Sequence, residues 1–317
     1  MSFVNGRDCC ITLKTQYREV CRNAERFCLA IPQSGIALPY AEETIRGAVS
    51  LLKEEAAIEG DGVCGGIRKP CGVTGCVVTP LSIETAPFLF VLALGRSEFP
   101  VFVSGTRNLY RHTVNLSAME GGLRFDLIQD RGTVRTLYEG CRVQGFELRI
   151  MRDEAVKLKL DICNALPGLC FGDHPPVSYS YPERAAVYGG ERAFCERFKE
   201  DGVAYRINGV EQKNFYGLTI STHKAGGTQT EVRIHRILDS AMELPPVIET
   251  LEITAQLFRD SYEFRSYGAF RLSLSRLVLM ADETMIDSGD AVIGPLRFYC
   301  AGGLSAEVFT GSEEMIR

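Results

Sequence analysis

The sequence predicts a mainly β fold of the α+β class, with antiparallel strands and a helix. Three observations lead to this class. Apolar and polar residues alternate with a period of two in both halves of the chain. The 317 residues include 31 glycines and no tryptophan, which indicates a turn-rich protein. Apolar residues make up 45% and charged residues 24%, so the composition is that of a folded globular protein rather than a disordered one.

The N-terminal quarter of the chain has no single clear pattern. Residues 1–40 mix isolated apolar residues with Arg, Asn and Gln, which predicts an extended arm rather than a packed element. Residues 41–58 fit both a helical stripe and strand alternation, so periodicity leaves the choice open. Residues 59–76 hold six glycines, a proline and three cysteines, and we expect an irregular loop there.

A helix is expected between Ser82 and Gly95, because this segment is broadly apolar and has a start and a stop signal. Ser82 can cap the N-terminus, and Gly95 can end the helix in a left-handed conformation. Pro87 must then lie in the first turns, where a missing N–H costs nothing, or kink the helix. The wide apolar face predicts a helix that is mostly buried.

A long antiparallel hairpin is predicted for residues 141–162. Residues 156–162 alternate cleanly between apolar and polar, and residues 141–150 alternate with a slip at Gly145–Phe146. A glycine at such a slip predicts a β-bulge. Residues 151–155 then form the turn between the two strands.

A connection rich in proline and glycine follows at residues 164–182. The rest of the chain then repeats the pattern of a possible helix and alternating strands. Residues 250–257 alternate, residues 258–268 are amphipathic and compatible with a helix, and strands follow at about 269–280, 293–300 and 303–309. A helix ending at glycine before strands would then occur twice, which suggests two related halves. The expected division is an arm (1–40), a first β domain (41–165), a connection (166–182) and a second β half (183–317).

Charge and hydropathy limit the classes of function. The chain has 35 basic and 40 acidic residues, a net charge of −5 and a pI near 5.6. This balance argues against a protein that binds nucleic acid by neutralising its phosphates, because such binding needs clustered positive charge. The N-terminus has no apolar signal region, and the longest apolar run, residues 86–94, is about half of a membrane span. We therefore expect synthesis in the cytoplasm and no membrane partner.

The cysteines and motifs offer no strong catalytic signal. Cys64, Cys71 and Cys76 share one glycine-rich segment without a Cys-x-x-Cys pair, so small buried thiols are favoured over a metal site. The Gly-x-Gly-x-x-Gly at residues 60–65 lies in the expected loop and is interpreted as a chance match. No cofactor, no metal and no enzymatic activity are expected.

Two further features have ordinary explanations. The acidic cluster at residues 282–290 could hold calcium, but its spacing is not that of an EF-hand, and a solvated turn is favoured. His112 could act as a general base, but no partner nucleophile is identifiable, so a half-buried strand histidine is favoured.

Several stretches of sequence nevertheless resemble one protein family. Residues 75–95 read Gly-Cys-Val-Val-Thr-Pro-Leu-Ser and then an apolar helix ending in Leu-Gly, and residues 138–148 read Tyr-Glu-Gly-Cys-Arg-Val-Gln-Gly-Phe-Glu-Leu. Together with Tyr-Arg-His-Thr-Val at 110–114 and the strand from Thr250, they resemble tail tube proteins of long-tailed (siphovirus-like) bacteriophages. The resemblance covers about residues 75–165 and 248–310; the cysteine-rich N-terminal region and residues 183–240 depart from it.

The resemblance implies a fold, an assembly and a set of partners. The fold would be a β-sandwich or rolled barrel with a flanking helix. Rings of three chains with pseudo-sixfold symmetry, or of six chains, would stack into a virion tail tube through which double-stranded DNA passes without specific recognition. Tape-measure, tail-tip and terminator proteins would be the other partners. The balanced charge is compatible with a channel to which DNA does not adhere.

The predicted hairpin offers candidates for the wall of such a channel, although either face of it could point inward. The candidates are its polar side chains Arg142, Gln144, Glu147, Arg149, Lys157, Lys159 and Asp161. Three other functions are left open. The first is the inner tube of a contractile injection system, the second is a β-sandwich that binds a ligand in an aromatic-lined cleft, and the third is an enzyme that depends on cysteine or metal.

Overall fold

The fold was analysed in a computed structural model of the chain. The structure describes residues 9–15, 36–38, 41–53, 66–82, 85–98, 100–105, 109–117, 123–131, 135–163, 177–178, 202–212, 215–237, 244–260, 265–283 and 293–310. Strands dominate these residues, one helix occurs among them, and all their strand pairs are antiparallel. The predicted mainly β class with an antiparallel sheet is confirmed.

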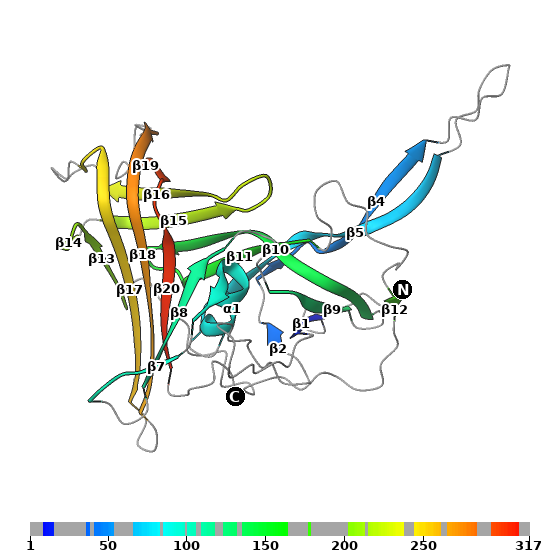
Figure 1. The fold of residues 1–317 in the computed structure, drawn as a ribbon, viewed down its shortest axis with the longest axis horizontal. Coiled ribbons are helices and arrows are strands. Elements are labelled where there is room, and N and C mark those ends of the chain that lie inside the picture. Colours follow the sequence, from blue (N-terminus) through cyan, green and yellow to red (C-terminus); the bar gives the residue numbers. More distant parts are fainter. Residues whose placement is uncertain are drawn as a thin grey trace.

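The principal sheet combines strands from distant parts of the sequence. Its neighbouring strands follow the order β4 (Arg46–Lys53), β5 (Gly66–Pro80), β11 (Lys157–Cys163), β10 (Arg135–Met151), β15 (Phe215–His223), β16 (Gln229–Ile237), β19 (Ile293–Cys300) and β18 (Arg265–Asp282). The pairing of β10 with β15 joins the predicted first domain to the predicted second half in one sheet. The outer part of the β4–β5 hairpin extends away from the body of the molecule (Figure 1).

A second set of strands branches from β18. The set consists of β17 (Val247–Asp260), β13 (Val203–Ile207) and β14 (Val210–Gln212) on one side of β18, and β20 (Leu304–Thr310), β8 (Tyr110–Leu116), β6 (Gly95–Ser97) and β7 (Val101–Phe102) on the other. Figure 1 shows β17, β18 and β20 running across the direction of β15 and β16. The sheet therefore turns a corner at β18, whose two ends pair with different neighbours.

A smaller group of strands lies at the other end of β10. It contains β1 (Cys9–Thr15), β2 (Ile36–Leu38), β9 (Phe125–Arg131) and β12 (Val177–Ser178), while the short β3 (Glu42–Glu43) pairs with β5. Ile11 and Leu13 of β1 are buried. The prediction that residues 1–40 are an unpacked arm is therefore wrong for β1 and β2. The apolar–polar alternation in β1 and β2 covers too few residues to be distinguished from chance. The pairing of β1 with the distant strand β9 identifies it as a strand.

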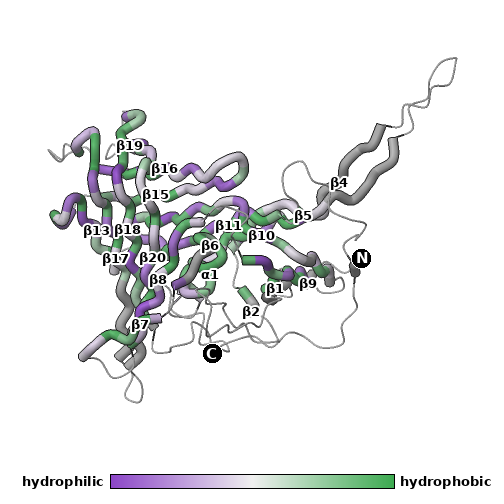
Figure 2. The backbone as a smooth tube through the Cα atoms, in the orientation of Figure 1, coloured by the Kyte–Doolittle hydropathy of each residue, from purple (hydrophilic) through white to green (hydrophobic). Residues whose placement is uncertain are grey.

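The helix α1 (Ala86–Leu94) lies at the centre of the core, and all nine of its residues are buried. It contacts β8, β10, β6 and β20, and hydrophobic residues of both parts of the chain join it in one cluster (Figure 2). The rings of Phe90 and Phe270 meet with centroids 5.2 Å apart, which links α1 to β18. The predicted mostly buried helix is confirmed.

The ends of α1 agree in part with the sequence signals. Gly95 has a φ of 104° and ends the helix as predicted, and Pro87 lies in the first turn. The N-cap residue is Thr85 rather than Ser82. The Ser82 hydroxyl instead accepts a hydrogen bond from the backbone N–H of Thr85 at 3.2 Å, and the Ser82 carbonyl accepts one from the backbone N–H of Ala86 at 3.0 Å.

Two predicted elements are replaced by strands. Residues 66–76 belong to β5, so the expected irregular loop at 59–76 is wrong there, and residues 59–65 with the Gly-x-Gly-x-x-Gly lie outside the described residues. Gly75 allows a close approach rather than a loop, since a Cβ there would lie 2.5 Å from the Thr44 carbonyl oxygen. The pairing of β4 with β5 shows that the ambiguous segment is a strand at Arg46–Lys53.

The helix considered possible at residues 258–268 does not form at residues 258–260 and 265–268, which are strands. β17 continues to Asp260 and β18 begins at Arg265, and Leu257 pairs with Gly268. Cross-strand pairing along the hairpin outweighs the weak helical periodicity of this segment. Among the described residues, a helix that is followed by a glycine and a strand occurs once. The expected repeat of this pattern therefore gives no support for two related halves.

The predicted hairpin of β10 and β11 is confirmed, including its bulge, where the register shifts between Val143 and Gly145. The strands predicted in the last third of the chain are confirmed as β17, β18, β19 and β20. The connection at 164–182 lies outside the described residues, apart from β12.

The shared core leads to a prediction about stability. Phe90→Ala should lower the free energy of unfolding by about 3–5 kcal/mol, because it empties a buried ring site between α1 and β18. Denaturant unfolding followed by circular dichroism measures the change. Val210→Ala is the control, since Val210 is 63% exposed. A loss below about 1 kcal/mol for Phe90→Ala would contradict the central position of α1.

Candidate functional site

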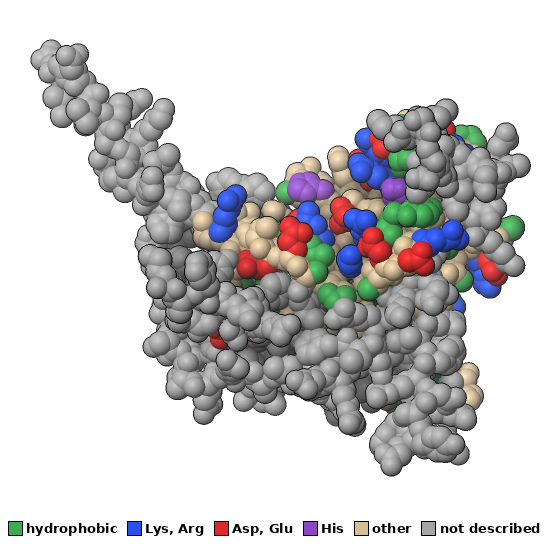
Figure 3. Space-filling view, turned by 180° about the vertical axis from the view of Figure 1, so that it is seen from behind, with side chains coloured by type: hydrophobic (Ala, Val, Ile, Leu, Met, Phe, Trp, Pro, Cys, Tyr) green, Lys and Arg blue, Asp and Glu red, His purple; other side chains and the backbone are tan. Residues whose placement is uncertain are grey.

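The most prominent polar surface is the solvent-facing side of β11, β10, β15, β16 and β19, here called the charged face. Along β11, Leu158, Leu160 and Ile162 are buried, while Lys157, Lys159 and Asp161 between them are partly exposed. The other four strands alternate in the same way, so one side of the sheet packs on the core and the other is wet. The view from behind shows basic and acidic side chains interspersed over this side (Figure 3).

The strand register arranges the charged face in rows that run perpendicular to the strands. Successive partners in the first row, here called the basic row, are Lys157, Arg149, Thr219, Arg233 and Arg297. Successive partners in the next row are Lys159, Glu147, Ser221, Glu231 and Tyr299. Directly opposite side chains lie about 4.5–5.5 Å apart at Cβ, so neighbours in a row interact.

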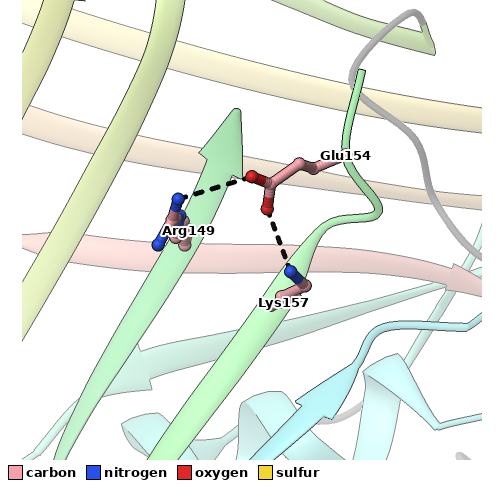
Figure 4. Close-up of polar contacts among 3 residues, drawn as sticks. All are labelled: Arg149, Glu154 and Lys157. Atoms are coloured by element: carbon pink, nitrogen blue, oxygen red, sulfur yellow. Dashed lines mark hydrogen bonds and ion pairs between the residues drawn. The ribbon is translucent and has the colours of Figure 1, made fainter. Parts of the chain in front are cut away.

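Ion pairs compensate part of the basic row. Glu154, in the turn of the hairpin, lies 2.9 Å from the Lys157 ammonium and 3.4 Å from the Arg149 guanidinium (Figure 4). The hydrogen bond from Lys157 lowers the pKa of Glu154 below its ordinary value. At the other end of the row, Arg297 lies 3.3 Å from Glu231 and 3.4 Å from Glu283.

Fewer of the described carboxylates neutralise the positive charge in the middle of the basic row. Within the described part of the chain, no carboxylate lies within 4.0 Å of the Arg233 guanidinium. His235, two residues along β16, has a lowered pKa because it is partly buried and because Arg149 and Arg233 repel a further positive charge. The two guanidiniums therefore act on the same region of the face.

The bulge decides which candidate wall residues share the charged face. Glu147, Arg149, Lys157, Lys159 and Asp161 lie on it, and Asp161 lies 3.6 Å from the Lys159 ammonium and raises the pKa of Lys159. Arg142 pairs with Cys163, two residues after Asp161 on β11, so the register keeps it on the same face beyond the bulge, whereas Gln144 is the extra residue of the bulge and pairs with no residue of β11. The slip in alternation at Gly145 was the signal for this arrangement.

The residues that β15, β16 and β19 contribute to the charged face were not predicted from the sequence. Thr219, Glu231, Arg233, His235 and Arg297 come from β15, β16 and β19. Buried Val232 and Ile234 alternate with the polar residues of β16, so the period of two was visible there. The sequence could not show that β15 lies beside β10.

A second polar surface is a groove of about 590 Å³ on β8, β17, β18 and β20. Hydroxyl and amide side chains dominate its described lining, in which Glu252 is the one carboxylate. The polar lining residues are Asn115, Ser117, Thr228, Thr230, Thr250, Glu252, Ser273, Ser275 and Ser305. Among the described lining residues none is aromatic, in contrast to the cleft expected of a ligand-binding sandwich.

The structure places the other chemical candidates apart from one another. No three His, Cys, Asp or Glu side chains among the described residues are placed to hold a metal ion. Cys141 is fully buried, and burial raises its pKa, which disfavours a thiolate nucleophile. His112 is fully rather than half buried. Cys71 and the partly buried Cys76 belong to β5, and Cys64 lies outside the described residues.

The acidic segment at 282–290 is described only at its start. Asp282 lies 3.0 Å from Arg236, and Glu283 pairs with Arg297 as described above. Asp287 and Asp290 lie outside the described residues. At its described end, the segment therefore neutralises arginines of the charged face and its border.

Lys224 is a buried lysine at the end of the β15 strand. Its ammonium donates a hydrogen bond to the carbonyl oxygen of Leu94, the last residue of α1, at 3.2 Å. Its backbone N–H donates to the carbonyl of the bulge residue Gln144 at 2.8 Å. Burial lowers the pKa of Lys224 to about 8. Since Lys224 does not line the groove, its contacts indicate a role in joining the helix to the bulge.

No protein-family model matches the chain, and no curated protein matches it. Among the described residues, no helix is both long and apolar enough to span a membrane.

The buried lysine predicts a distinctive pH dependence of stability. The pKa of Lys224 falls from 10.5 to about 8 on folding, so the unfolded chain binds more protons between these values. The free energy of unfolding attributable to Lys224 therefore rises as the pH increases from about 8 to about 10.5. Lys224→Met should remove this rise. Urea unfolding of both proteins across this range measures it, and parallel pH profiles would contradict the assignment.

The bulge predicts a cost for adding one methyl group. A Cβ at position 145 would lie 2.8 Å from the Thr222 carbonyl oxygen, so Gly145→Ala should lower the free energy of unfolding by about 1–3 kcal/mol. Gly303→Ala is the matched control, because the nearest atom, Ser275 Oγ, is 4.0 Å away. Equal effects of the two changes in denaturant unfolding would contradict this account of the bulge.

Proposed function

We propose that this protein is the major subunit of a phage-type tail tube, in which copies form rings, rings stack, and double-stranded DNA passes through the channel. The observation that carries the proposal is the charged face, a polar surface built by neighbouring strands from distant parts of the chain over one apolar core. A channel wall needs such a sheet, wet on one side and packed on the other. The proposed location is the virion tail, after synthesis in the host cytoplasm.

The distribution of charge supports passage rather than capture of DNA. Acidic side chains accompany the basic ones across the face, as in the pairs of Glu154 with Lys157, Asp161 with Lys159 and Glu231 with Arg297. Strong adhesion to DNA requires many uncompensated cations, because affinity comes from neutralised phosphates. Interspersed charges keep the wall hydrated while limiting adhesion.

Free strand edges and the long hairpin support self-assembly. Among the described residues, β4 pairs with β5 alone and β14 with β13 alone, which leaves an unpaired edge on each. An unpaired edge favours pairing with another chain, and a head-to-tail contact closes a ring when its rotation closes. The outer part of the β4–β5 hairpin extends away from the body (Figure 1), so we expect it to contact a neighbouring copy in the same or the next ring.

Six chains fit this channel better than three. The charged face contains five neighbouring strands, β11, β10, β15, β16 and β19. Three chains would then give a wall of about fifteen strands, fewer than the roughly 16–18 strands of porins, whose lumen is an aqueous channel. Six chains give about thirty strands, and barrel diameter grows with strand number, so a duplex fits more readily.

The proposal includes the inner tube of a contractile injection system, which differs by the sheath that surrounds it. A sheath protein encoded beside this chain would identify that variant. The ligand-binding alternative has less support, because the described residues that line the groove on β8, β17, β18 and β20 include no aromatic side chain.

Assembly and the orientation of the charged face can be tested together. Negative-stain microscopy of the purified chain should show rings or tubes. A small amine-reactive reagent should modify Lys157 and Lys159 in monomers and in tubes, whereas a polymer-linked reagent too large for the channel should modify them only in monomers. Mass spectrometry of the peptide that carries both lysines measures the difference.

Two outcomes would contradict the proposal. A chain that stays monomeric at high concentration, even with a tail-tip or tape-measure partner, is not a tube subunit. Equal modification of Lys157 and Lys159 by the large reagent in tubes would place the charged face on the exterior.

A further inference from the structure

At the centre of the charged face, the strand register places one threonine between two arginines. Arg149 of β10 lies opposite Thr219 of β15, and Thr219 lies opposite Arg233 of β16. Neighbouring strands are about 4.8 Å apart, so the two arginine backbones are separated by roughly 10 Å, with Thr219 between them. An extended arginine side chain spans most of this distance, so both guanidiniums can converge above Thr219.

These two arginines have an excess of positive charge. The Glu154 carboxylate lies 3.4 Å from Arg149 and 2.9 Å from Lys157. One negative charge therefore neutralises part of two positive charges. No described carboxylate lies within 4.0 Å of the Arg233 guanidinium. Both side chains are exposed, and that of Arg149 keeps 49% of its accessible surface.

The neighbouring charges do not cancel this excess. Glu231 and Glu283 both form ion pairs with Arg297, which lies opposite Arg233 in the basic row. Glu147 lies in the next row, beside Lys159. His235, whose pKa is lowered by burial and by both arginines, is largely neutral at neutral pH. The region therefore favours an anion.

We propose that Arg149, Thr219 and Arg233 form a phosphate-binding cluster on the charged face. Guanidinium groups present N–H donors in a planar fork that matches phosphate oxygens, and the threonine hydroxyl adds a third donor. Phosphate is the ligand class because donors on both sides of Thr219 can contact separate oxygens of one tetrahedral anion.

The source of the phosphate is either the DNA backbone or the free anion. The DNA source rests on the proposed function, since it requires the charged face to line the channel. The cluster would then recur once per chain around each ring, as a belt of discrete backbone contacts on an otherwise compensated wall. Contacts this sparse guide a moving duplex without holding it, because affinity grows with the number of phosphates neutralised.

The test measures binding of two probes to the purified full chain. A fluorescent DNA duplex is followed by anisotropy across a range of salt concentrations, and inorganic phosphate is titrated by calorimetry. Arg233→Gln and Arg149→Gln should each weaken binding about 10- to 150-fold, because hydrogen bonds to charged groups contribute about 1.5–3 kcal/mol. For DNA, each lost contact should reduce the slope of log affinity against log salt by about 0.9.

Two further variants sharpen the test. Glu154→Gln should strengthen binding of both probes, since it releases Arg149 and Lys157 from their shared carboxylate. Arg271→Gln is the matched control, because Arg271 is an exposed arginine on β18 that pairs with Glu307 outside the cluster. It should leave the affinity for both probes unchanged. Denaturant unfolding of each variant checks that the fold is intact.

Each result has a defined meaning. Losses for both probes in the Arg149 and Arg233 variants support the cluster with the DNA backbone as a ligand, and a loss for inorganic phosphate alone supports it with the free anion as the ligand. Unchanged binding of both probes in these variants, or an equal loss in Arg271→Gln, overturns the cluster. Rings are scored separately by microscopy, so a failure of the tube proposal remains distinguishable from a failure of the cluster.

Discussion

The burial of one helix constrains the rest of this structure. All nine residues of α1 are apolar and buried, so the helix has no polar side to turn toward water. It must be covered all round, and strands from both parts of the chain cover it, with Phe270 of β18 against Phe90. This requirement explains why the predicted first domain and second half share one core.

The polar ends of the buried helix impose a second requirement. Helix termini leave backbone groups without intrahelical partners, and burial makes such groups costly. The Leu94 carbonyl accepts hydrogen bonds from the backbone N–H and hydroxyl of Ser117 and from the Lys224 ammonium. Lys224 also binds the bulge through its backbone, so the end of the helix and the bulge in β10 are held by the same residue.

The core determines where polar side chains can lie. A sheet that packs one face on α1 and its surroundings must turn the alternate residues of every strand outward. Five strands in register then convert the alternation into rows, and the basic row is a product of register as much as of composition. The proposed channel wall and the proposed phosphate-binding cluster both derive from this arrangement.

Local patterns in the sequence determined the mainly β class, the end of α1 at Gly95, the β10–β11 hairpin with its bulge, and the strands of the last third. Each of these depends on residues close in the sequence. Tertiary structure decided the remainder. β1 becomes a strand only beside β9, and Gly75 of β5 permits close backbone approach rather than a loop. Arg149 and Arg233 belong to one site only because β15 lies between β10 and β16. Pairing between distant segments is a property of the packed core, and no local pattern contains it.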